Sequence, residues 1–323
     1  MIRSTPVIPR MALTLLAVTA VSAQTKWTVV STEQLTHSGM SYGGALSPDG
    51  REIVIDDHAR FFLKDLDSGQ TRQLLPDSQT GSHGAVFTSD GKTIYFEAFK
   101  KADAPGKSYP SYLASLELTE GATLQPVPGF DKPYAASVSP DGKSIAYLVH
   151  EENLNRSLKV QPLAGGAARK LFSWNAGSYY FRPPSWSPDS ETIVVHKGRS
   201  DRDVLLAVSV KSGEAKEMPS PRKTIGGTFW PARANGLFAG VCDDKCQIWH
   251  LSIPGGQWTQ VTHDDWGFAP DWLSANADGT MLLAARGIIA RDFWDTMLGM
   301  FVKDYPKELK VDLVLMRVKF TRP

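Results

Sequence analysis

The chain has 323 residues, of which 42% are hydrophobic and 21% charged, and its formal net charge is +1. This is the composition of a globular protein that is long enough to bury a core. The near-neutral balance, without a run of Lys and Arg, excludes the electrostatic footprint of a nucleic-acid-binding protein. It also excludes a polybasic patch for a membrane surface.

The first predicted element is a secretory leader. Arg3 and Arg10 give a positive segment, Met11–Val21 is an apolar run, and Val21–Ala23 is a small-residue cleavage site. We therefore predict a signal peptide over residues 1–23, and a mature protein that is periplasmic or secreted with no membrane span. An uncleaved anchor is the alternative, although a bilayer needs about 20 apolar residues.

Six times along the rest of the chain, a short apolar strand runs into a tight turn and a second apolar strand follows. The turn residues are Asp49, Asp90, Asp141, Asp189, Asn235 and Asp278. Their spacing of 41 to 51 residues, with hairpin chemistry in each copy, predicts a β-propeller with one blade per repeat. We therefore predict an all-β fold in which residues 24–323 form six blades.

The strands of the first blade can be predicted individually. They are 42–47, 51–56, 60–66 and 71–75. The last repeat has a third strand at 311–319 but no sequence after it for a fourth, whereas Trp27–Thr36 resembles the fourth strands of other repeats. We expect this N-terminal strand to complete the last blade, which would cover two strand edges that otherwise favour aggregation.

The two cysteines of the chain, Cys242 and Cys246, flank a predicted hairpin turn. A hairpin would place them opposite each other, and in an exported protein we expect a disulfide between them. Free thiols or a redox role are the alternatives. A metal site would need about four ligands, and no Cys or His pair at a suitable spacing accompanies them, so we predict no metal and no cofactor.

The candidate binding site follows from position in the fold. The connections that lead into the inner strands should open on one face of a propeller, where loops on a rigid scaffold commonly carry function. The residues just before the inner strands are mostly aromatic: Tyr42, His83, Tyr134, Phe181, Arg182, Trp266 and Phe268. Aromatic rings with a few polar groups suit a peptide or a sugar. The alternative is that these rings only plug the channel.

The repeats resemble a known family. Ser47–Gly50 and Ser139–Gly142 both read Ser-Pro-Asp-Gly, the repeat of the TolB-type β-propellers, which are similar to WD-repeat proteins and to the propeller domains of prolyl-oligopeptidase relatives. Gln247–Gly256 and Asp312–Phe320 also resemble this repeat. The resemblance covers Trp27 to Phe320 and implies the fold. It implies no catalytic residue, because the matched motif is structural.

Because we recognise no catalytic cluster, we predict that the protein is not an enzyme. We expect an exported binding module that holds an envelope protein segment or a small ligand, a peptide or a sugar, at the channel mouth. One alternative is a glycan lyase or hydrolase, with His83 as the base and Arg182 as the charge stabiliser. A second alternative is a detached sensor propeller of an envelope signalling or transport system.

Overall fold

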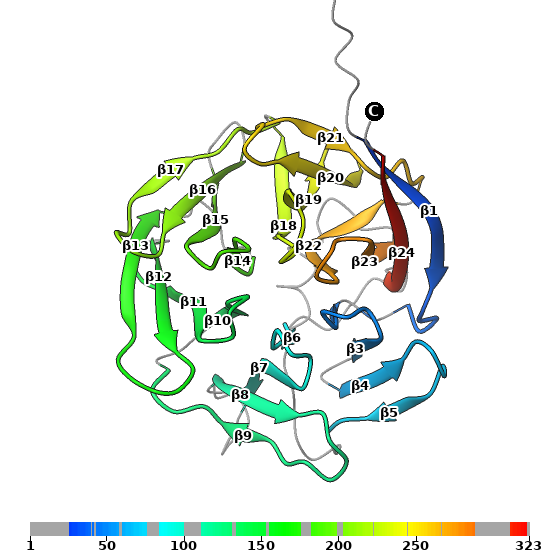
Figure 1. Cartoon of the computed structure of the whole chain (residues 1–323), viewed down its shortest axis with the longest axis horizontal. Coiled ribbons are helices and arrows are strands. Elements are labelled where there is room, and N and C mark those ends of the chain that lie inside the picture. Colours follow the sequence, from blue (N-terminus) through cyan, green and yellow to red (C-terminus); the bar gives the residue numbers. More distant parts are fainter. Residues whose placement is uncertain are drawn as a thin grey trace, which may run out of the picture.

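The computed structural model describes fourteen segments of the chain. They are residues 26–39, 41, 43–57, 60–75, 84–99, 111–130, 134–152, 155–175, 182–198, 203–221, 223–243, 245–265, 267–287 and 311–321. These residues form strands and no helix. The strands build a closed ring of six blades, so the predicted all-β, six-bladed propeller is confirmed (Figure 1). The predicted signal peptide, residues 1–23, lies outside the described residues.

Each blade is a four-stranded antiparallel sheet. Blade one holds β2 (Gly43–Leu46), β3 (Glu52–Asp57), β4 (Arg60–Asp65) and β5 (Thr71–Gln73). Blade two holds β6 (Val86–Phe87), β7 (Thr93–Phe99), β8 (Ser111–Glu117) and β9 (Gln125–Pro126). Blade three holds β10 (Tyr134–Val138), β11 (Ser144–His150), β12 (Asn155–Pro162) and β13 (Arg169–Asn175).

The remaining blades repeat this pattern. Blade four holds β14 (Ser185–Trp186), β15 (Thr192–Gly198), β16 (Asp203–Ser209) and β17 (Ala215–Glu217). Blade five holds β18 (Thr224–Phe229), β19 (Gly236–Cys242), β20 (Cys246–Ser252) and β21 (Trp258–Gln260). Blade six holds β22 (Phe268–Ala275), β23 (Met281–Gly287), β24 (Val311–Thr321) and β1 (Lys26–Gln34).

The ring is closed by the first and last strands of the chain. β1 pairs with β24 in register from Lys26–Thr321 to Gln34–Val314, with a bulge between Val29 and Ser31. Strand β1 is therefore the outermost strand of blade six, as the sequence predicted, and lies beside β24 at the edge of the ring (Figure 1). In each of the other five blades the third and fourth strands are consecutive in the chain. In blade six only the pairing of β24 with β1 joins them.

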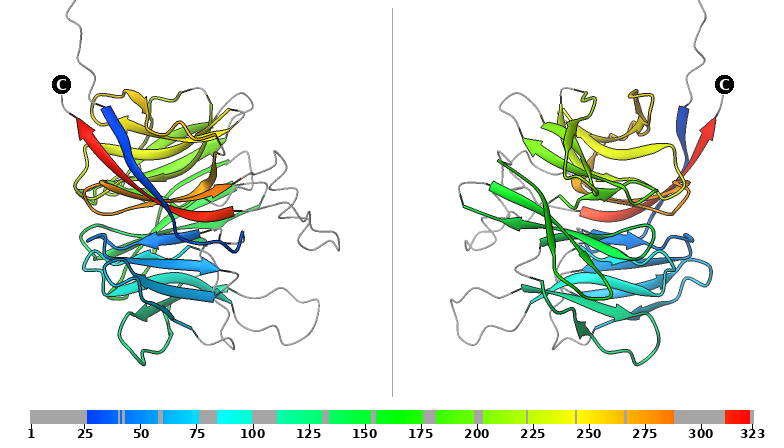
Figure 2. Two further views of the ribbon diagram at one scale, coloured as in Figure 1. Left: turned by 90° about the vertical axis from the view of Figure 1, so that its right-hand side faces the viewer. Right: turned by 60° about the vertical axis from the view of Figure 1, so that its left-hand side comes forward.

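All blades present the same two faces. Neighbouring strands are antiparallel, so each inner strand and each third strand begins on one face of the ring, which we call the mouth face. The turns between first and second strands, and between third and fourth strands, lie on the opposite face. Side views of the ring show these two faces on opposite sides of the propeller (Figure 2). Residues that precede β10, β14, β18 or β22 therefore belong to the mouth face.

The core lies between adjacent blades. Phe61 of blade one and Phe96 of blade two are buried and meet edge to face, with ring centroids 4.9 Å apart. Trp27 of β1 makes the same kind of contact with Phe238 of blade five, at 5.2 Å. Because aromatic pairs of this geometry add to the free energy gained by burying apolar area, these contacts stabilise the packing of neighbouring blades.

The Asp-Gly turns are held by short-range hydrogen bonds. In the first turn the Ser47 hydroxyl donates to Asp49 Oδ1 at 2.7 Å, and the backbone N–H of Arg51 donates to the same oxygen at 3.1 Å. In the fourth, hydrogen bonds from the Ser187 hydroxyl and the Glu191 backbone N–H lower the pKa of Asp189. These carboxylates bond their own turns, which confirms a structural role for the repeated Asp.

Two equivalent glycines allow a matched test of the turn geometry. Gly69 and Gly213 close the turns between third and fourth strands, with φ of +73° and +75°. A Cβ at Gly69 would meet nothing within 4 Å, but one at Gly213 would lie 2.4 Å from the backbone oxygen of Leu171. We expect Gly69→Ala to cost about 1–2 kcal/mol of stability from backbone strain.

Gly213→Ala should cost about 1–3 kcal/mol more than Gly69→Ala, because the backbone of Leu171 must also move. Urea unfolding of the two variants measures the difference. Equal losses would show that Leu171 adjusts without cost and that only the left-handed φ matters.

Candidate functional site

The structure describes part of the predicted aromatic ring. Tyr42, His83, Phe181 and Trp266 lie outside the described residues. The backbone of Tyr134 begins β10 on the mouth face. Arg182 and Phe268 are described in full, and both are buried, with exposed fractions of 4%. The prediction that these seven residues bind a ligand therefore stays a prediction.

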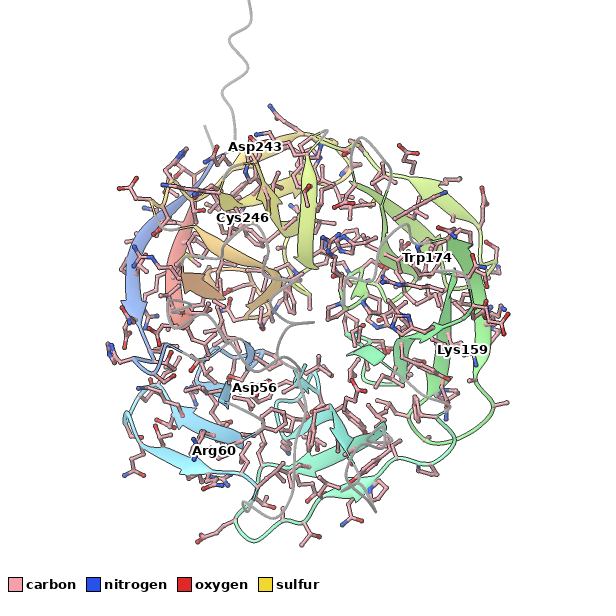
Figure 3. All side chains as sticks on the ribbon, turned by 180° about the vertical axis from the view of Figure 1, so that it is seen from behind. Asp56, Arg60, Lys159, Trp174, Asp243 and Cys246 are labelled. Carbon is pink, nitrogen blue, oxygen red and sulfur yellow. A yellow bond between two sulfur atoms is a disulfide. The ribbon has the colours of Figure 1, made fainter. Side chains whose placement is uncertain are left out.

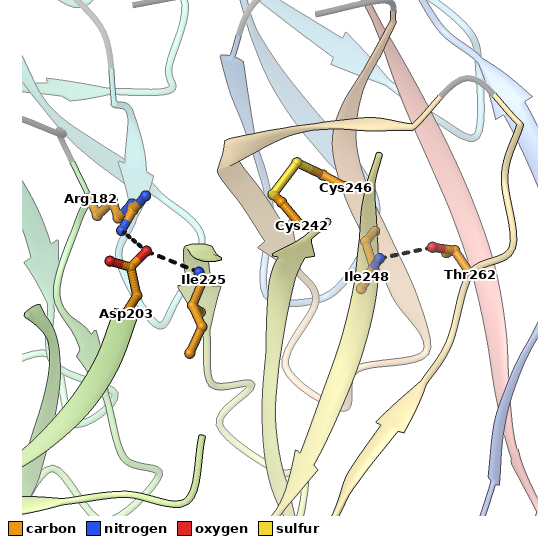
Figure 4. Close-up of a disulfide and its surroundings, with 7 residues drawn as sticks. All are labelled: Arg182, Asp203, Ile225, Cys242, Cys246, Ile248 and Thr262. Carbon is orange, nitrogen blue, oxygen red and sulfur yellow. Dashed lines mark hydrogen bonds and ion pairs between the residues drawn. A yellow bond between two sulfur atoms is a disulfide. The ribbon is translucent and has the colours of Figure 1, made fainter. Parts of the chain in front are cut away.

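Arg182 is held in a buried ion pair. Its Nη1 donates to Oδ2 of Asp203, the first residue of β16, at 3.1 Å, and the two side chains are 3% and 10% exposed. The same carboxylate oxygen accepts the backbone N–H of Ile225 at 3.0 Å (Figure 4). Asp203 thus joins the segment before β14 to the inner strand of blade five. Arg182 has a structural partner, which sequence reasoning did not foresee.

Phe268 belongs to the core of blades five and six. Its backbone pairs with Arg286 of β23, and its ring packs in a cluster with Ile248, Val261 and Leu282. The side chain of Phe268 therefore packs in the core between the two blades and does not line the mouth. Sequence position alone placed it in the mouth, because the register shift that follows between Phe268 and Leu273 cannot be read from the pattern of residues.

Arg156, Arg182, His196 and Asp203 form a buried polar cluster below the mouth face, and each of them is 7% exposed or less. The Nε2 of His196 lies 3.3 Å from the Thr228 hydroxyl, and the carbonyl of His196 accepts the Trp174 indole N–H at 2.9 Å. Trp174 lies on the last strand of blade three (Figure 3). The cluster therefore ties blades three, four and five together.

The buried polar cluster keeps His196 neutral. Burial, followed by the charges of Arg182 and Arg156, holds the pKa of His196 well below its ordinary value of 6.5. Burial also lowers the pKa of His250 to about 4. In the unfolded chain both rings would take up a proton near pH 6.5, so acid favours the unfolded state.

We therefore expect stability to fall as the pH drops below about 6.5, by up to about 1.4 kcal/mol per pH unit for each of these two histidines. His196→Gln should roughly halve this slope, because it removes one of the two buried rings. Urea unfolding at a series of pH values between 5 and 7 gives the slopes. A wild-type slope of zero would show that both His196 and His250 are protonated in the folded protein.

The predicted disulfide is present. Cys242 ends β19 and Cys246 begins β20, the two are opposite each other in the antiparallel register, and their Sγ atoms are bonded. The disulfide lies at the mouth-face end of blade five, in the same blade as Asp243 (Figures 3 and 4). Asp243 forms an ion pair with Lys223, whose Nζ also lies 5.3 Å from the centre of the Trp249 ring.

One motif was missed in the sequence. Gly39-Met40-Ser41-Tyr42-Gly43 fits Gly-x-Ser-x-Gly, the pattern of a nucleophile elbow. A nucleophile elbow places the serine between a strand and a helix, with an exposed hydroxyl. Ser41 instead lies between strands β1 and β2, is 1% exposed, and contacts the Ser38 hydroxyl at 3.2 Å. In the structure this serine therefore lacks the setting of an elbow nucleophile.

The described residues bring together no three His, Cys, Asp or Glu side chains that could hold a metal ion. Within the same ranges, no helix is long and apolar enough to cross a membrane. His58 and His83 lie outside the described residues.

Comparison with known proteins gives one sequence relative and many similar folds. No family model matches the chain. The chain is 27% identical over 187 residues to a protein of Bacillus subtilis (strain 168) named "Uncharacterized peptidase YuxL". The match covers 54% of this chain and 26% of that protein, so the chain spans about a quarter of its relative's length.

Among solved structures, a putative TolB from Agrobacterium tumefaciens is 16% identical, with a TM-score of 0.59 over 81% of this chain and 87% of that one. An oligogalacturonate lyase in complex with manganese is also 16% identical, with a TM-score of 0.54 over 88% of this chain and 79% of that one. The fold is therefore that of a TolB-type β-propeller, as the resemblance of the repeats implied.

Two of these three similar proteins are named as enzymes. They contradict our predictions that the chain is a non-catalytic binding module and that it is not an enzyme. The physical reason for the error is that the repeat motif stabilises turns and carries no chemistry, so the absence of a recognised catalytic motif was not evidence about activity. A propeller can support catalysis through side chains on its connections, which have no common spacing in the sequence.

Proposed function

We propose that this chain is a catalytic β-propeller that hydrolyses peptides. The observation that carries the proposal is the 27% identity over 187 residues to a protein named as a peptidase. That protein is much longer than the matched region, so the assignment of its peptidase activity to this chain is a proposal. The likeness of solved structures supports the fold and adds nothing about the substrate.

The structure suggests what a propeller would contribute to such a reaction. Peptide segments would meet the mouth face, where Lys223, Asp243 and Lys245 lie beside the disulfide hairpin and Asp264 pairs with Arg286 at 3.0 Å. Groups of both signs on a rigid rim can pair with the charged ends and side chains of a peptide, and so orient it. The buried polar cluster would keep that rim in place.

The proposal is tested by incubating the protein with a panel of aminoacyl and peptidyl p-nitroanilides and measuring release of nitroaniline. Lys223→Gln should raise KM with little change in kcat, because an orienting charge is lost from the rim. The matched control is Lys216→Gln, whose ion pair with Glu214 at 3.4 Å lies on the opposite face and is exposed. Absence of turnover with every peptide would contradict the proposal.

A second candidate is a glycan lyase, in line with one of our sequence-based alternatives. It is favoured by the likeness to oligogalacturonate lyase, which extends over 79% of that enzyme, so that a propeller makes up most of it. That structure contains manganese, but the described residues of this chain offer no group of three ligands for a metal. We therefore derive no step through a metal.

The lyase candidate predicts that oligogalacturonate is cleaved by elimination, which forms a double bond in the product and raises its ultraviolet absorbance. His83→Ala should abolish this reaction if His83 is the base that removes the proton. Arg182 is less suited to the role of charge stabiliser, because Asp203 already accepts its hydrogen bond in a buried site. An unchanged absorbance with the wild-type protein, with and without added Mn²⁺, would exclude this candidate.

We also place the protein outside the cytoplasm, in the periplasm or secreted. Two features support this: the leader pattern of residues 1–23, and the disulfide, since disulfides persist mainly in oxidising compartments. Cell fractionation followed by mass spectrometry of the N-terminus tests both. A cytoplasmic protein that still begins at Met1 would contradict them.

A further inference from the structure

The disulfide hairpin of blade five is connected to both neighbouring blades on the mouth face. We define it by the described residues Cys242, Asp243, Lys245, Cys246 and Gln247. Both cysteines are partly exposed at this end of the blade, so a small thiol can reach them. The hairpin therefore combines a partly exposed disulfide with a position next to the proposed peptide-binding rim.

On the side of blade four, the hairpin is connected through Lys223. Asp243 pairs with the Lys223 ammonium group, and the carbonyl of Lys223 accepts the backbone N–H of Asp203 at 3.4 Å. Asp203 in turn binds Arg182. A displacement of Asp243 would thus reach the segment that leads into the inner strand of blade four.

On the side of blade six, the hairpin is connected to the segment that leads into β22. Gln247 donates from Nε2 to the carbonyl of Asp264 at 2.7 Å and accepts the Asp264 backbone N–H at Oε1 at 2.9 Å. Lys245 donates from Nζ to the carbonyl of Asp265. Asp264 then pairs with Arg286 at 3.0 Å. Both connections depend on residues within or directly after the disulfide ring.

The disulfide is placed for a local effect. It joins residues only four positions apart, and a short loop of this kind constrains the unfolded chain much less than a long one does. The strands on either side are already paired over seven register positions, from Gly236–Ser252 to Cys242–Cys246. The bond therefore adds little to the stability of the blade as a whole, but it fixes the positions of Asp243 and Lys245.

We propose that the Cys242–Cys246 disulfide is a thiol–disulfide exchange site that controls the order of the mouth on blades four to six. An external dithiol is the co-reactant. Its thiolate attacks one cysteine sulfur, the bond between Cys242 and Cys246 breaks, and a mixed disulfide forms. The second thiolate of the dithiol then attacks the dithiol's own sulfur in the mixed disulfide, and the two released cysteine thiolates take up protons. The protein is left with two thiols, and the dithiol is oxidised to its own disulfide.

Reduction releases the hairpin while the propeller stays folded. Asp243 and Lys245 then no longer hold Lys223 and Asp265 in fixed positions, and the rim becomes less ordered. The oxidised protein is thus the form that orients substrate, and the reduced form binds it more weakly. This effect on substrate rests on the proposed function, whereas the change in order of the rim does not.

The test compares hydrogen exchange of oxidised and dithiothreitol-reduced protein by mass spectrometry. We expect exchange in 223–225, 245–248 and 262–265 to become several-fold faster on reduction, and exchange in blades one and two to stay unchanged. The Cys242→Ser/Cys246→Ser variant should match the reduced protein and show no response to dithiothreitol. If exchange at 262–265 is the same in both forms, the bond is only a local staple and the proposal fails.

Peptide turnover is measured on the same samples, with the p-nitroanilide panel as the probe. We expect KM to rise on reduction of the wild-type protein and to be insensitive to dithiothreitol in the double Ser variant. A lack of turnover in all samples would overturn the peptidase proposal while the exchange data still decide the redox proposal. Faster exchange throughout the molecule would show global unfolding instead of local release, and would also overturn it.

Discussion

Arg182→Ala will lower the free energy of unfolding by about 3–5 kcal/mol, the range measured when one member of a buried ion pair is removed. The variant leaves Asp203 in a site where its side chain is 10% exposed, with the Ile225 N–H as a remaining partner. An uncompensated charge in such a place is costly because water cannot solvate it. Urea unfolding monitored by tryptophan fluorescence measures the loss.

The control for this prediction is Lys170→Ala. Lys170 pairs with Glu151 at 3.0 Å, but the two side chains are 53% and 37% exposed, so solvent screens the pair. We expect a loss below about 1 kcal/mol. If Arg182→Ala costs no more than Lys170→Ala, then the ion pair with Asp203 adds little to stability and binding of a ligand by Arg182 stays a prediction. If it costs several times more, a loss of binding in that variant is not evidence of contact with a ligand.

Trp27→Ala will destabilise the protein by about 3–5 kcal/mol, as large-to-small substitutions of buried aromatic residues do. Trp27 is 6% exposed, and its ring lies 5.2 Å from Phe238 and 5.6 Å from His250, both in blade five. Among the described residues nothing accepts a hydrogen bond from its indole N–H, so no hydrogen bond is lost with the side chain. This residue anchors β1, and through it the closure of the ring.

Val30→Ala in the same strand is the matched control for Trp27→Ala. Val30 lies at the bulge of β1 and is 66% exposed, so its removal should change stability by less than about 0.5 kcal/mol. Thermal unfolding of both variants, followed by circular dichroism, gives the comparison. A small effect of Trp27→Ala would mean that strand pairing with β24 is sufficient to close the propeller without packing between blades five and six.

The fold could be predicted from the sequence because its signals are local. A turn such as Ser47–Gly50 needs only Ser, Asp and Gly at fixed positions, and the structure forms the hydrogen bonds that this spacing requires. The strands of blade one lie within two residues of their predicted bounds for the same reason. Closure was predictable as well, because an incomplete last repeat and a spare first strand complement each other.

The sequence predicts the face of the propeller on which the candidate site lies, but not which side chains line it. Position before an inner strand indicates the face on which a residue lies, but it does not indicate whether the side chain points to the channel or into a neighbouring blade. Arg182 and Phe268 both proved to be buried: Arg182 pairs with Asp203, 21 positions along the chain, and Phe268 packs in a cluster with Ile248 of blade five. Partners of this kind depend on how blades pack, which no local pattern encodes.

The pairing of β1 with β24 has a consequence for the order in which the protein can be made. Thr28 and Lys319 are hydrogen-bonded across 291 positions of the chain, so a ribosome must synthesise almost all of it before the circle can close. Until then β1 has no sheet to join and Trp27 has no completed site to occupy. The ring of a nascent chain therefore stays open until its last strand has been synthesised.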